Sequence, residues 1–204
     1  MFDEPARRLM PRLLGAPVRW LVRASVSPNL LSWLGLTLAL GAALAVANAF
    51  AWSGLLLWLV SRVVDALDGL VARESGRSSS FGGYLDITLD MVAYGAMVLA
   101  FAVVHPAQWL LMLCVMFGYL LVTTTTLALS SILEREARQR PNNNRTLQFT
   151  PGFAEAGETS LVYVAWTALP AWIAPIGWIW VGLCLATVVQ RTLLARRLLV
   201  DPPR

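Results

Sequence analysis

Four aspartates lie within one short stretch, residues 65–90, whose sequence is DALDGLVARESGRSSSFGGYLDITLD. Asp65 and Asp68 are three residues apart, and Asp86 and Asp90 are four apart. On a helix, both spacings place the two carboxylates on one face, one turn apart. The apolar sequence on both sides indicates membrane-spanning helices, in which carboxylates are costly and commonly functional. The spacing therefore predicts two carboxylate pairs with a chemical role.

The two pairs are expected to face each other, because the loop ESGRSSSF between their helices is short and makes the helices antiparallel neighbours. Four carboxylates brought together repel one another, so either some are protonated or cations bind between them. Mg²⁺ and Mn²⁺ prefer oxygen ligands, and two such ions can share carboxylates. Ion pairs with Arg62 and Arg73 alone are the alternative, but two arginines cannot neutralise four aspartates.

Small residues and an arginine accompany the carboxylates. Gly69 and Ala72 share the helical face of the first pair, Gly82 lies at the start of the next segment, and Arg73 follows Ala72. Small side chains allow close helix packing and also leave room for a ligand. An arginine suits a phosphate or diphosphate oxygen. Carboxylates, a divalent metal, a cleared pocket and an arginine together indicate a phosphoryl-transfer site.

The elements that position these residues are predicted to be membrane helices. The chain has 204 residues, of which 57% are hydrophobic and 14% charged, a balance typical of a polytopic membrane protein. Six apolar segments are each near the length of about 20 residues that a bilayer requires. They run over residues 29–50, 52–72, 81–104, 109–130, 154–173 and 176–200. The predicted fold class is therefore an all-α integral membrane protein with six transmembrane helices.

The arginines predict how these helices are oriented. All 16 basic residues are arginine, and the net charge is +4. Arginines precede the first segment, lie between the second and third and between the fourth and fifth, and follow the sixth, whereas the other three connections have none. The positive-inside rule then places both termini in the cytoplasm. No nucleic-acid motif accompanies the basic charge, so membrane lipids are the expected partners and nucleic acid is not.

The chain before the first span is expected to form an amphipathic juxtamembrane helix. Within residues 4–25, arginines occupy one helical face and apolar side chains another, namely Arg8, Arg12, Arg19 and Arg23 against Met10, Leu13, Leu14 and Leu21. An ordinary charged membrane flank is the alternative. The predicted organisation is this helix over residues 1–26, followed by the six-helix domain over residues 27–204.

The site residues form one pattern, Asp65-x2-Asp68-Gly69-x2-Ala72-Arg73-x8-Gly82-x3-Asp86-x3-Asp90. This pattern resembles the signature of the CDP-alcohol phosphotransferase (class-I CDP-alcohol phosphatidyltransferase) family, with every fixed position filled. The six spans, the cytoplasmic termini and the SPN sequence before the first span also fit, so the resemblance covers nearly the whole chain. The chain is similar to short bacterial members of the family.

The resemblance implies a reaction. Family members catalyse a reaction in which the hydroxyl of one alcohol attacks the β-phosphate of a CDP-linked alcohol, usually CDP-diacylglycerol, and CMP leaves. Carried over, Asp65, Asp68 and Asp86 hold two Mg²⁺ or Mn²⁺ ions, and Asp90 completes that set and acts as general base. The donor-binding residues are then Gly69, Ala72 and Gly82 at the cytidine and Arg73 at the diphosphate. The resemblance also implies a homodimer in the bacterial cytoplasmic membrane, with the active site facing the cytoplasm.

The acceptor site is the least determined part of the prediction. Arg62 either pairs with one of the aspartates or contacts the acceptor. Glu155 and Glu158 either interact with the dipole at a helix N-terminus or bind acceptor hydroxyls. Arg145 and Arg191 either bind an acceptor phosphate or are flanking charges.

The leading hypothesis is a phosphatidyltransferase of phospholipid biosynthesis that uses CDP-diacylglycerol and a small, phosphorylated polyol acceptor. One alternative is a family member that uses a soluble CDP-alcohol donor and makes a non-lipid phosphodiester. A remote alternative is a cation-coupled transporter, but neither inverted repeats nor paired broken helices are visible in the sequence.

Overall fold

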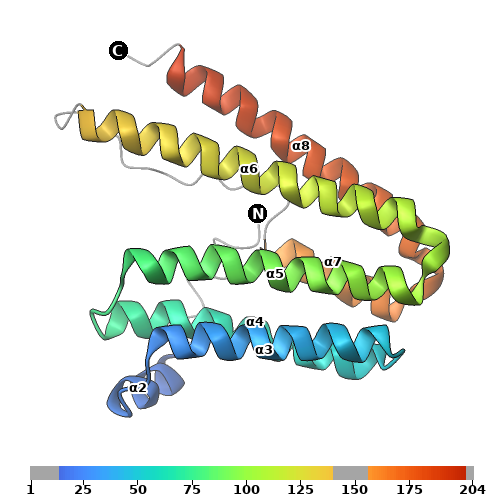
Figure 1. Cartoon of the computed structure of the whole chain (residues 1–204), viewed down its shortest axis with the longest axis horizontal. Helices are drawn as coiled ribbons and strands as arrows, with labels where there is room; N and C mark the ends of the chain where they lie inside the picture. Colours follow the sequence, from blue (N-terminus) through green and yellow to red (C-terminus); the bar gives the residue numbers. More distant parts are fainter. Residues whose placement is uncertain (1–13, 140–155, 201–204) are drawn as a thin grey trace.

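The computed structural model of the chain describes residues 14–139 and 156–200, and these residues contain helices and no strands (Figure 1). Two short 3₁₀ turns, η1 (Pro106–Gln108) and η2 (Pro170–Trp172), precede α6 and α8. The α-helices are α2 (Gly15–Arg23), α3 (Pro28–Ala47), α4 (Ala51–Glu74), α5 (Ser80–Val104), α6 (Trp109–Gln139), α7 (Ala156–Ala168) and α8 (Ile173–Leu199).

Four of these helices are long and apolar enough to cross a membrane. They lie within Pro28–Ala47, Ser80–Val104, Pro106–Arg135 and Pro170–Leu199. Helix α4 is less apolar because its middle carries Arg62, Asp65 and Asp68, and the described part of α7 has 13 residues. Large apolar side chains are exposed on the outer faces of all four candidate spans, as expected for helices that contact lipid. The chain is therefore an all-α, multi-pass membrane protein.

The helices form two groups. Helix α3 packs against both α4 and α5, α6 packs against α8, and α7 contacts α4 and α8. In Figure 1, α6 and α8 separate from α5 toward the end of the molecule at which α2 lies. The loop from α4 to α5 lies at that same end, whereas the connections from α3 to α4, from α5 to α6 and from α7 to α8 lie at the opposite end (Figure 1).

The predicted apolar segments correspond to the helices α3 to α8, and two of the described helix ends differ from the prediction by more than three residues. Helix α6 continues nine residues past the predicted end at Ser130, to Gln139. Helix α7 ends at Ala168, before the predicted end of its segment at residue 173. The chain leaves the helix at Leu169 because Pro170, which has no N–H to donate, begins the turn η2.

Helix α2 is the described part of the predicted juxtamembrane helix. Its Val18 is buried with Leu31 of α3 and Val71 of α4, while Arg19 and Arg23 are exposed. The apolar face thus packs on the α3–α4 pair and the arginines face away from it. Residues 1–13, which include Arg8, Arg12, Met10 and Leu13, lie outside the described residues.

Helices α3 and α4 approach each other closely at a glycine. A Cβ on Gly54 would lie 2.6 Å from Val46 Cγ2 and 2.8 Å from the carbonyl oxygen of Ala42, so only glycine fits here. Further along the same contact, a Cβ on Gly35 would lie 3.6 Å from the backbone nitrogen of Asp65. Glycines on both helices, Gly54 on α4 and Gly35 on α3, therefore allow α4 with its carboxylates to lie close to α3.

Candidate active site

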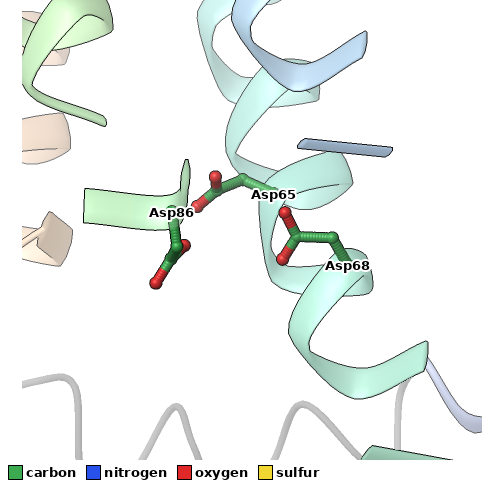
Figure 2. Close-up of side chains that lie close together, drawn as sticks. All are labelled: Asp65, Asp68 and Asp86. Carbon is green, nitrogen blue, oxygen red and sulfur yellow. The ribbon is translucent and has the colours of Figure 1, made fainter. Parts of the chain in front are cut away.

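Three of the four predicted aspartates form one cluster, with Asp65 and Asp68 on α4 and Asp86 on α5 (Figure 2). Each offers one carboxylate oxygen, and these oxygens all lie within 4.8 Å of one another. Asp68 is buried, Asp65 is half-buried and Asp86 is exposed. Three oxygen ligands at these separations fit a hard divalent ion such as Mg²⁺ or Mn²⁺. The cluster could therefore hold the predicted metal.

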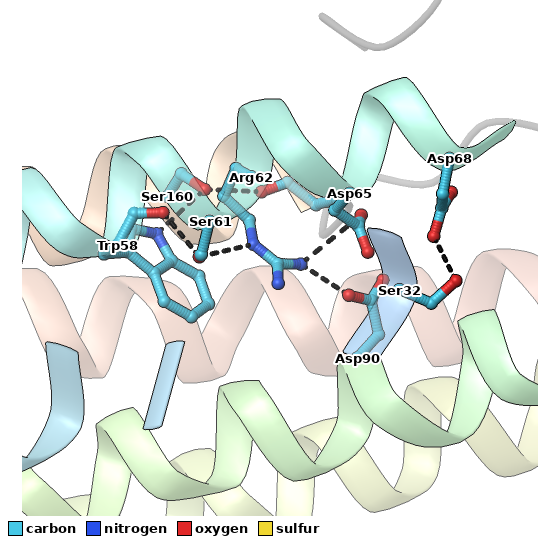
Figure 3. Close-up of polar contacts among 9 residues, drawn as sticks. Ser32, Trp58, Ser61, Arg62, Asp65, Asp68, Asp90 and Ser160 are labelled. Carbon is cyan, nitrogen blue, oxygen red and sulfur yellow. Dashed lines mark hydrogen bonds and ion pairs between the residues drawn. The ribbon is translucent and has the colours of Figure 1, made fainter. Parts of the chain in front are cut away.

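The fourth aspartate, Asp90, lies outside this cluster and is paired with Arg62. Arg62 Nη1 donates to Asp90 Oδ1 and also lies 3.6 Å from Asp65 Oδ2 (Figure 3). The guanidinium carbon lies 4.7 Å from the centroid of the Trp58 ring and 5.4 Å from that of Tyr94. The ion pair expected for Arg62 is therefore present, and aromatic rings cover the guanidinium.

Ser32 of α3 is a site residue that the sequence analysis missed. Its Oγ donates to Asp68 Oδ2 at 2.5 Å (Figure 3), and the serine is 6% exposed. This hydrogen bond orients the Asp68 carboxylate within the cluster. The sequence held one usable signal, because Ser32 lies one helical turn after Asn29 of the SPN sequence that begins this helix.

A cavity of about 240 Å³ lies between α3, α4 and α5, beside the cluster. All four predicted donor-binding residues line it, as do Asp68 and Asp86; the four are Gly69, Ala72, Arg73 and Gly82. The glycines keep it open, because a Cβ on Gly69 would lie 3.2 Å from Arg73 Nη1 and one on Gly82 would lie 3.2 Å from Ser79 Oγ. Ser79 Oγ also accepts a hydrogen bond from the Gly82 N–H at 3.0 Å, which caps the start of α5.

A second cavity, of about 540 Å³, lies between α5, α6 and α8 on the other side of the cluster. Asp90 and Tyr94 line it from α5, and Arg191 lines it from α8. Gly83 and Asp86 line both cavities, so the two cavities meet at the exposed aspartate of the cluster. The sequence analysis predicted an acceptor site but did not foresee these walls, which come from helices far apart in the sequence.

The predicted acceptor residues have different positions. Arg191 Nη1 donates to the carbonyl oxygen of Val122, at 3.0 Å, and to Thr126 Oγ1, so the side chain is fixed against α6 at the wall of the second cavity. Glu158 lies in the first turn of α7, next to Thr159, which lines the same cavity. Arg145 and Glu155 lie outside the described residues.

Hydrogen-bonded aromatic residues hold the helices together beneath the second cavity. The hydroxyls of Tyr119 and Tyr163 lie 3.2 Å apart, and Trp180 Nε1 donates to Tyr119 at 3.2 Å. The Tyr163 hydroxyl also lies 3.2 Å from the carbonyl oxygen of Tyr94, to which it donates. These bonds join α5, α6, α7 and α8, and they satisfy the polar groups of the Tyr119, Tyr163 and Trp180 rings.

The sequence profile of the CDP-alcohol phosphatidyltransferase family matches residues 25–190. This chain belongs to that family. The matched residues include both aspartate pairs, the whole lining of the smaller cavity, all of the lining of the second cavity except Arg191, and five of the six longest helices in full. The chain is thus a membrane transferase of the CDP-alcohol phosphatidyltransferase family, with an aspartate cluster suited to metal binding.

Two relatives resemble the chain over most of its length. The inner membrane protein YnjF of Escherichia coli (strain K12) is 29% identical over 195 residues, which cover 91% of this chain and 92% of YnjF. The phosphatidylinositol phosphate synthase of Cutibacterium acnes is 30% identical over 189 residues, which cover 87% of this chain and 89% of the synthase.

The fold is shared with the phosphatidylinositol phosphate synthase of Mycobacterium tuberculosis. Its crystal structure with CDP-diacylglycerol bound has a TM-score of 0.74 and 20% identity, and the match covers 91% of this chain and 94% of the synthase. The structure of the same synthase with manganese and citrate also has a TM-score of 0.74.

Proposed function

We propose that the chain transfers a phosphatidyl group from CDP-diacylglycerol to the hydroxyl of a small, phosphorylated polyol and releases CMP, as a step of phospholipid biosynthesis. The observation that carries this proposal is the position of the aspartate cluster between two cavities. One cavity is lined by the residues predicted to bind the CDP donor, and the other by Asp90 and Arg191. The Cutibacterium acnes relative is a phosphatidylinositol phosphate synthase, which supports an acceptor of this class.

The donor is assigned to the smaller cavity. Arg73 would contact the diphosphate, while Gly69, Ala72 and Gly82 would leave room for the cytidine. A Mg²⁺ or Mn²⁺ ion held by the three clustered aspartates would offset negative charge on the diphosphate and on the departing CMP. These contacts would fix the β-phosphorus near the wall that separates the two cavities.

Asp90 is the proposed general base. It lines the second cavity, and Arg62 orients its carboxylate through the bond to Oδ1. The acceptor hydroxyl gives its proton to Asp90 while its oxygen forms a bond to the β-phosphorus. The bond from that phosphorus to the CMP oxygen breaks, and CMP takes the electron pair.

The acceptor is assigned to the second cavity, with its phosphate near Arg191. Because Arg191 is fixed by α6, its guanidinium is positioned before a ligand arrives. Arg145, Glu155 and Glu158 are proposed as further acceptor contacts. Arg191→Met should raise KM for a phosphorylated acceptor about tenfold or more, since it removes a charge-assisted contact. Arg196→Met, at an exposed position on the same helix, is the matched control.

We also propose that α4 and α7 cross the membrane with the four candidate spans, which gives six spans with both termini in the cytoplasm. The arginine-free connections at one end of the molecule support this orientation. The protein would then lie in the cytoplasmic membrane of a bacterium, with its active site facing the cytoplasm. The expected homodimer is tested by the mass of the detergent-purified protein in light scattering.

The decisive experiment incubates purified protein with Mn²⁺, CDP-diacylglycerol and a panel of alcohols that includes glycerol 3-phosphate, inositol phosphate, inositol and serine. CMP and the new lipid are measured together by mass spectrometry. Wild-type protein should release CMP when a phosphorylated polyol is present. Asp90→Asn should release no CMP, although it should still bind CDP-diacylglycerol. Absence of CMP release with every acceptor would contradict the proposal. In a parallel assay CDP-glycerol replaces CDP-diacylglycerol, and turnover with CDP-glycerol but not with CDP-diacylglycerol would favour a soluble donor.

A further inference from the structure

Gly83 is a glycine that neither packing nor backbone geometry requires. A Cβ on Gly83 would meet no described atom within 4 Å, whereas a Cβ on Gly69 or Gly82 would lie 3.2 Å from a neighbouring side-chain atom. Gly83 lies in the first turn of α5, where its N–H donates to the carbonyl oxygen of Ser79 at 3.1 Å, and its φ is not positive. Glycine within a helix is less favourable than alanine by about 1 kcal/mol. The packing of the described residues therefore gives no reason for the absence of a side chain here.

The position of Gly83 within the site offers a reason. Of the described residues that line the two cavities, only Gly83 and Asp86 line both, and both are exposed. They are three residues apart on α5 and share a helical face, which Asp90 continues into the second cavity. The junction between the two cavities is therefore formed by one carboxylate of the aspartate cluster and by a residue without a side chain.

A side chain at position 83 would occupy this junction. Because nothing packs against the Cβ position, the added atoms would extend into the open space of the cavities and would not displace a neighbouring residue. A branched aliphatic side chain would narrow the junction and separate a ligand in one cavity from a ligand in the other. Gly182 of α8 is equally open but lines neither cavity, so the same side chain there would leave the junction unchanged.

We infer that Gly83 determines the size of the junction at which the two substrates meet, and that its missing side chain lets the acceptor hydroxyl reach the β-phosphorus of the donor. Gly83 is then a specificity-determining residue that contributes open space and no functional group. This inference rests on the proposed function, because it takes the donor to lie in the smaller cavity and the acceptor in the second cavity.

Substitution by side chains of increasing size tests the inference. Gly83→Ala should keep most of the wild-type turnover, because a methyl group leaves most of the junction open. Gly83→Leu should lower kcat about 100-fold, the loss expected when reacting atoms are held roughly 1 Å out of place. Its Tm in detergent should not fall, since no neighbour is displaced, and the matched control Gly182→Leu should keep the wild-type kcat. Wild-type turnover in Gly83→Leu, an equal loss in Gly182→Leu, or a lower Tm in Gly83→Leu overturns the inference.

A second experiment needs no turnover. In a background with Cys114 and Cys184 replaced by alanine, purified Gly83→Cys is labelled with a maleimide, and Val200→Cys, exposed after the end of α8, is the control. CDP-diacylglycerol with Mn²⁺ should slow labelling at position 83, and so should glycerol 3-phosphate or inositol phosphate, whereas labelling at position 200 should not change.

Protection of position 83 by neither kind of ligand, or by only one, overturns the inference. The result is independent of the reaction itself. Protection by both kinds of ligand without CMP release refutes only the proposed transfer, and CMP release without protection refutes only the role of Gly83.

Discussion

Ser32 and Arg62 act on the site through its carboxylates, and neither belongs to the eight fixed positions of the aspartate pattern. Ser32 orients Asp68 from α3, and Arg62 orients Asp90 from α4. Both side chains are largely enclosed by protein, so each fixes its carboxylate before any ligand binds. At this scale, reactivity depends on partners of the aspartates as well as on the aspartates themselves.

Ser32→Ala should weaken metal binding without unfolding the protein. The variant loses a hydrogen bond to a charged group, and loss of such an outer partner lowers metal affinity by about 10-fold to 100-fold. The Kd for Mn²⁺, measured by calorimetry, should rise accordingly. Thr37→Ala is the control, because Thr37 lies on the same helix, is exposed and donates to the backbone oxygen of Trp33. Equal affinity in the two variants would show that Ser32 does not orient the ligand.

The two partners also show what sequence reasoning could and could not find. The contact of Arg62 with Asp65 was expected, since the two residues lie three positions apart on the same helix and local spacing determines such contacts. The bond from Arg62 to Asp90 joins residues 28 positions apart and depends on the position of α5 beside α4. Ser32 and Asp68 lie 36 positions apart, and their contact depends on the packing of α3 on α4. Spacing within one helix says nothing about that packing, so the serine passed as an ordinary residue of an apolar segment.

Among the elements, α3 determines where the aspartates of α4 lie. The glycine contact at Gly54 sets how near the two helices approach, and Gly35 continues the contact beside Asp65. The sequence predicted these helices closely because apolar length marks a membrane span. Their interface was not predicted, because glycines are frequent throughout apolar helices and do not themselves identify a partner. The early end of α7 had a visible cause in Pro170, but its effect on the number of candidate spans required the structure.

Gly54→Ala should destabilise the protein, whereas Gly182→Ala should not. The new methyl group at position 54 would meet Val46 and the backbone of Ala42, and overpacking of this kind costs about 1–3 kcal/mol. A Cβ at Gly182 of α8 meets no atom within 4 Å, and alanine there improves helix propensity by about 1 kcal/mol. Thermal unfolding in detergent should therefore show a lower Tm for the first variant and an unchanged or higher Tm for the second. The same sign for both would contradict the tight contact.

For the whole molecule, the arrangement of helix ends follows the arginines. The two arginine-free turns that contain prolines, η1 and η2, lie at the end opposite α2 (Figure 1). Counting charges in connections uses only the sequence and relies on a rule that the bilayer imposes on every span, so the cytoplasmic position of the termini stays a prediction. No comparable rule predicts the second cavity from the sequence, since α5, α6 and α8 meet there only in the folded molecule.

Single cysteines test the orientation directly. In a background with Cys114 and Cys184 replaced by alanine, Ala107→Cys lies in η1 and Val200→Cys follows α8, and both positions are exposed. With cytoplasmic termini, a membrane-impermeant maleimide added to intact cells should label position 107 and spare position 200. Opening the cells should allow both to be labelled. Labelling of position 200 in intact cells would reverse the proposed topology.

Asp86 and Gly83 are shared by two cavities that lie on opposite sides of them. With the proposed donor in one cavity and the proposed acceptor in the other, a common wall would allow both to be bound at once, and no covalent intermediate between the phosphatidyl group and the protein would be needed. Initial rates measured against both substrates should then give intersecting double-reciprocal lines, the mark of a ternary complex. Labelled CMP should likewise fail to exchange into CDP-diacylglycerol when no lipid product is present. The proposed two-cavity arrangement around Asp86 thus predicts a sequential kinetic order.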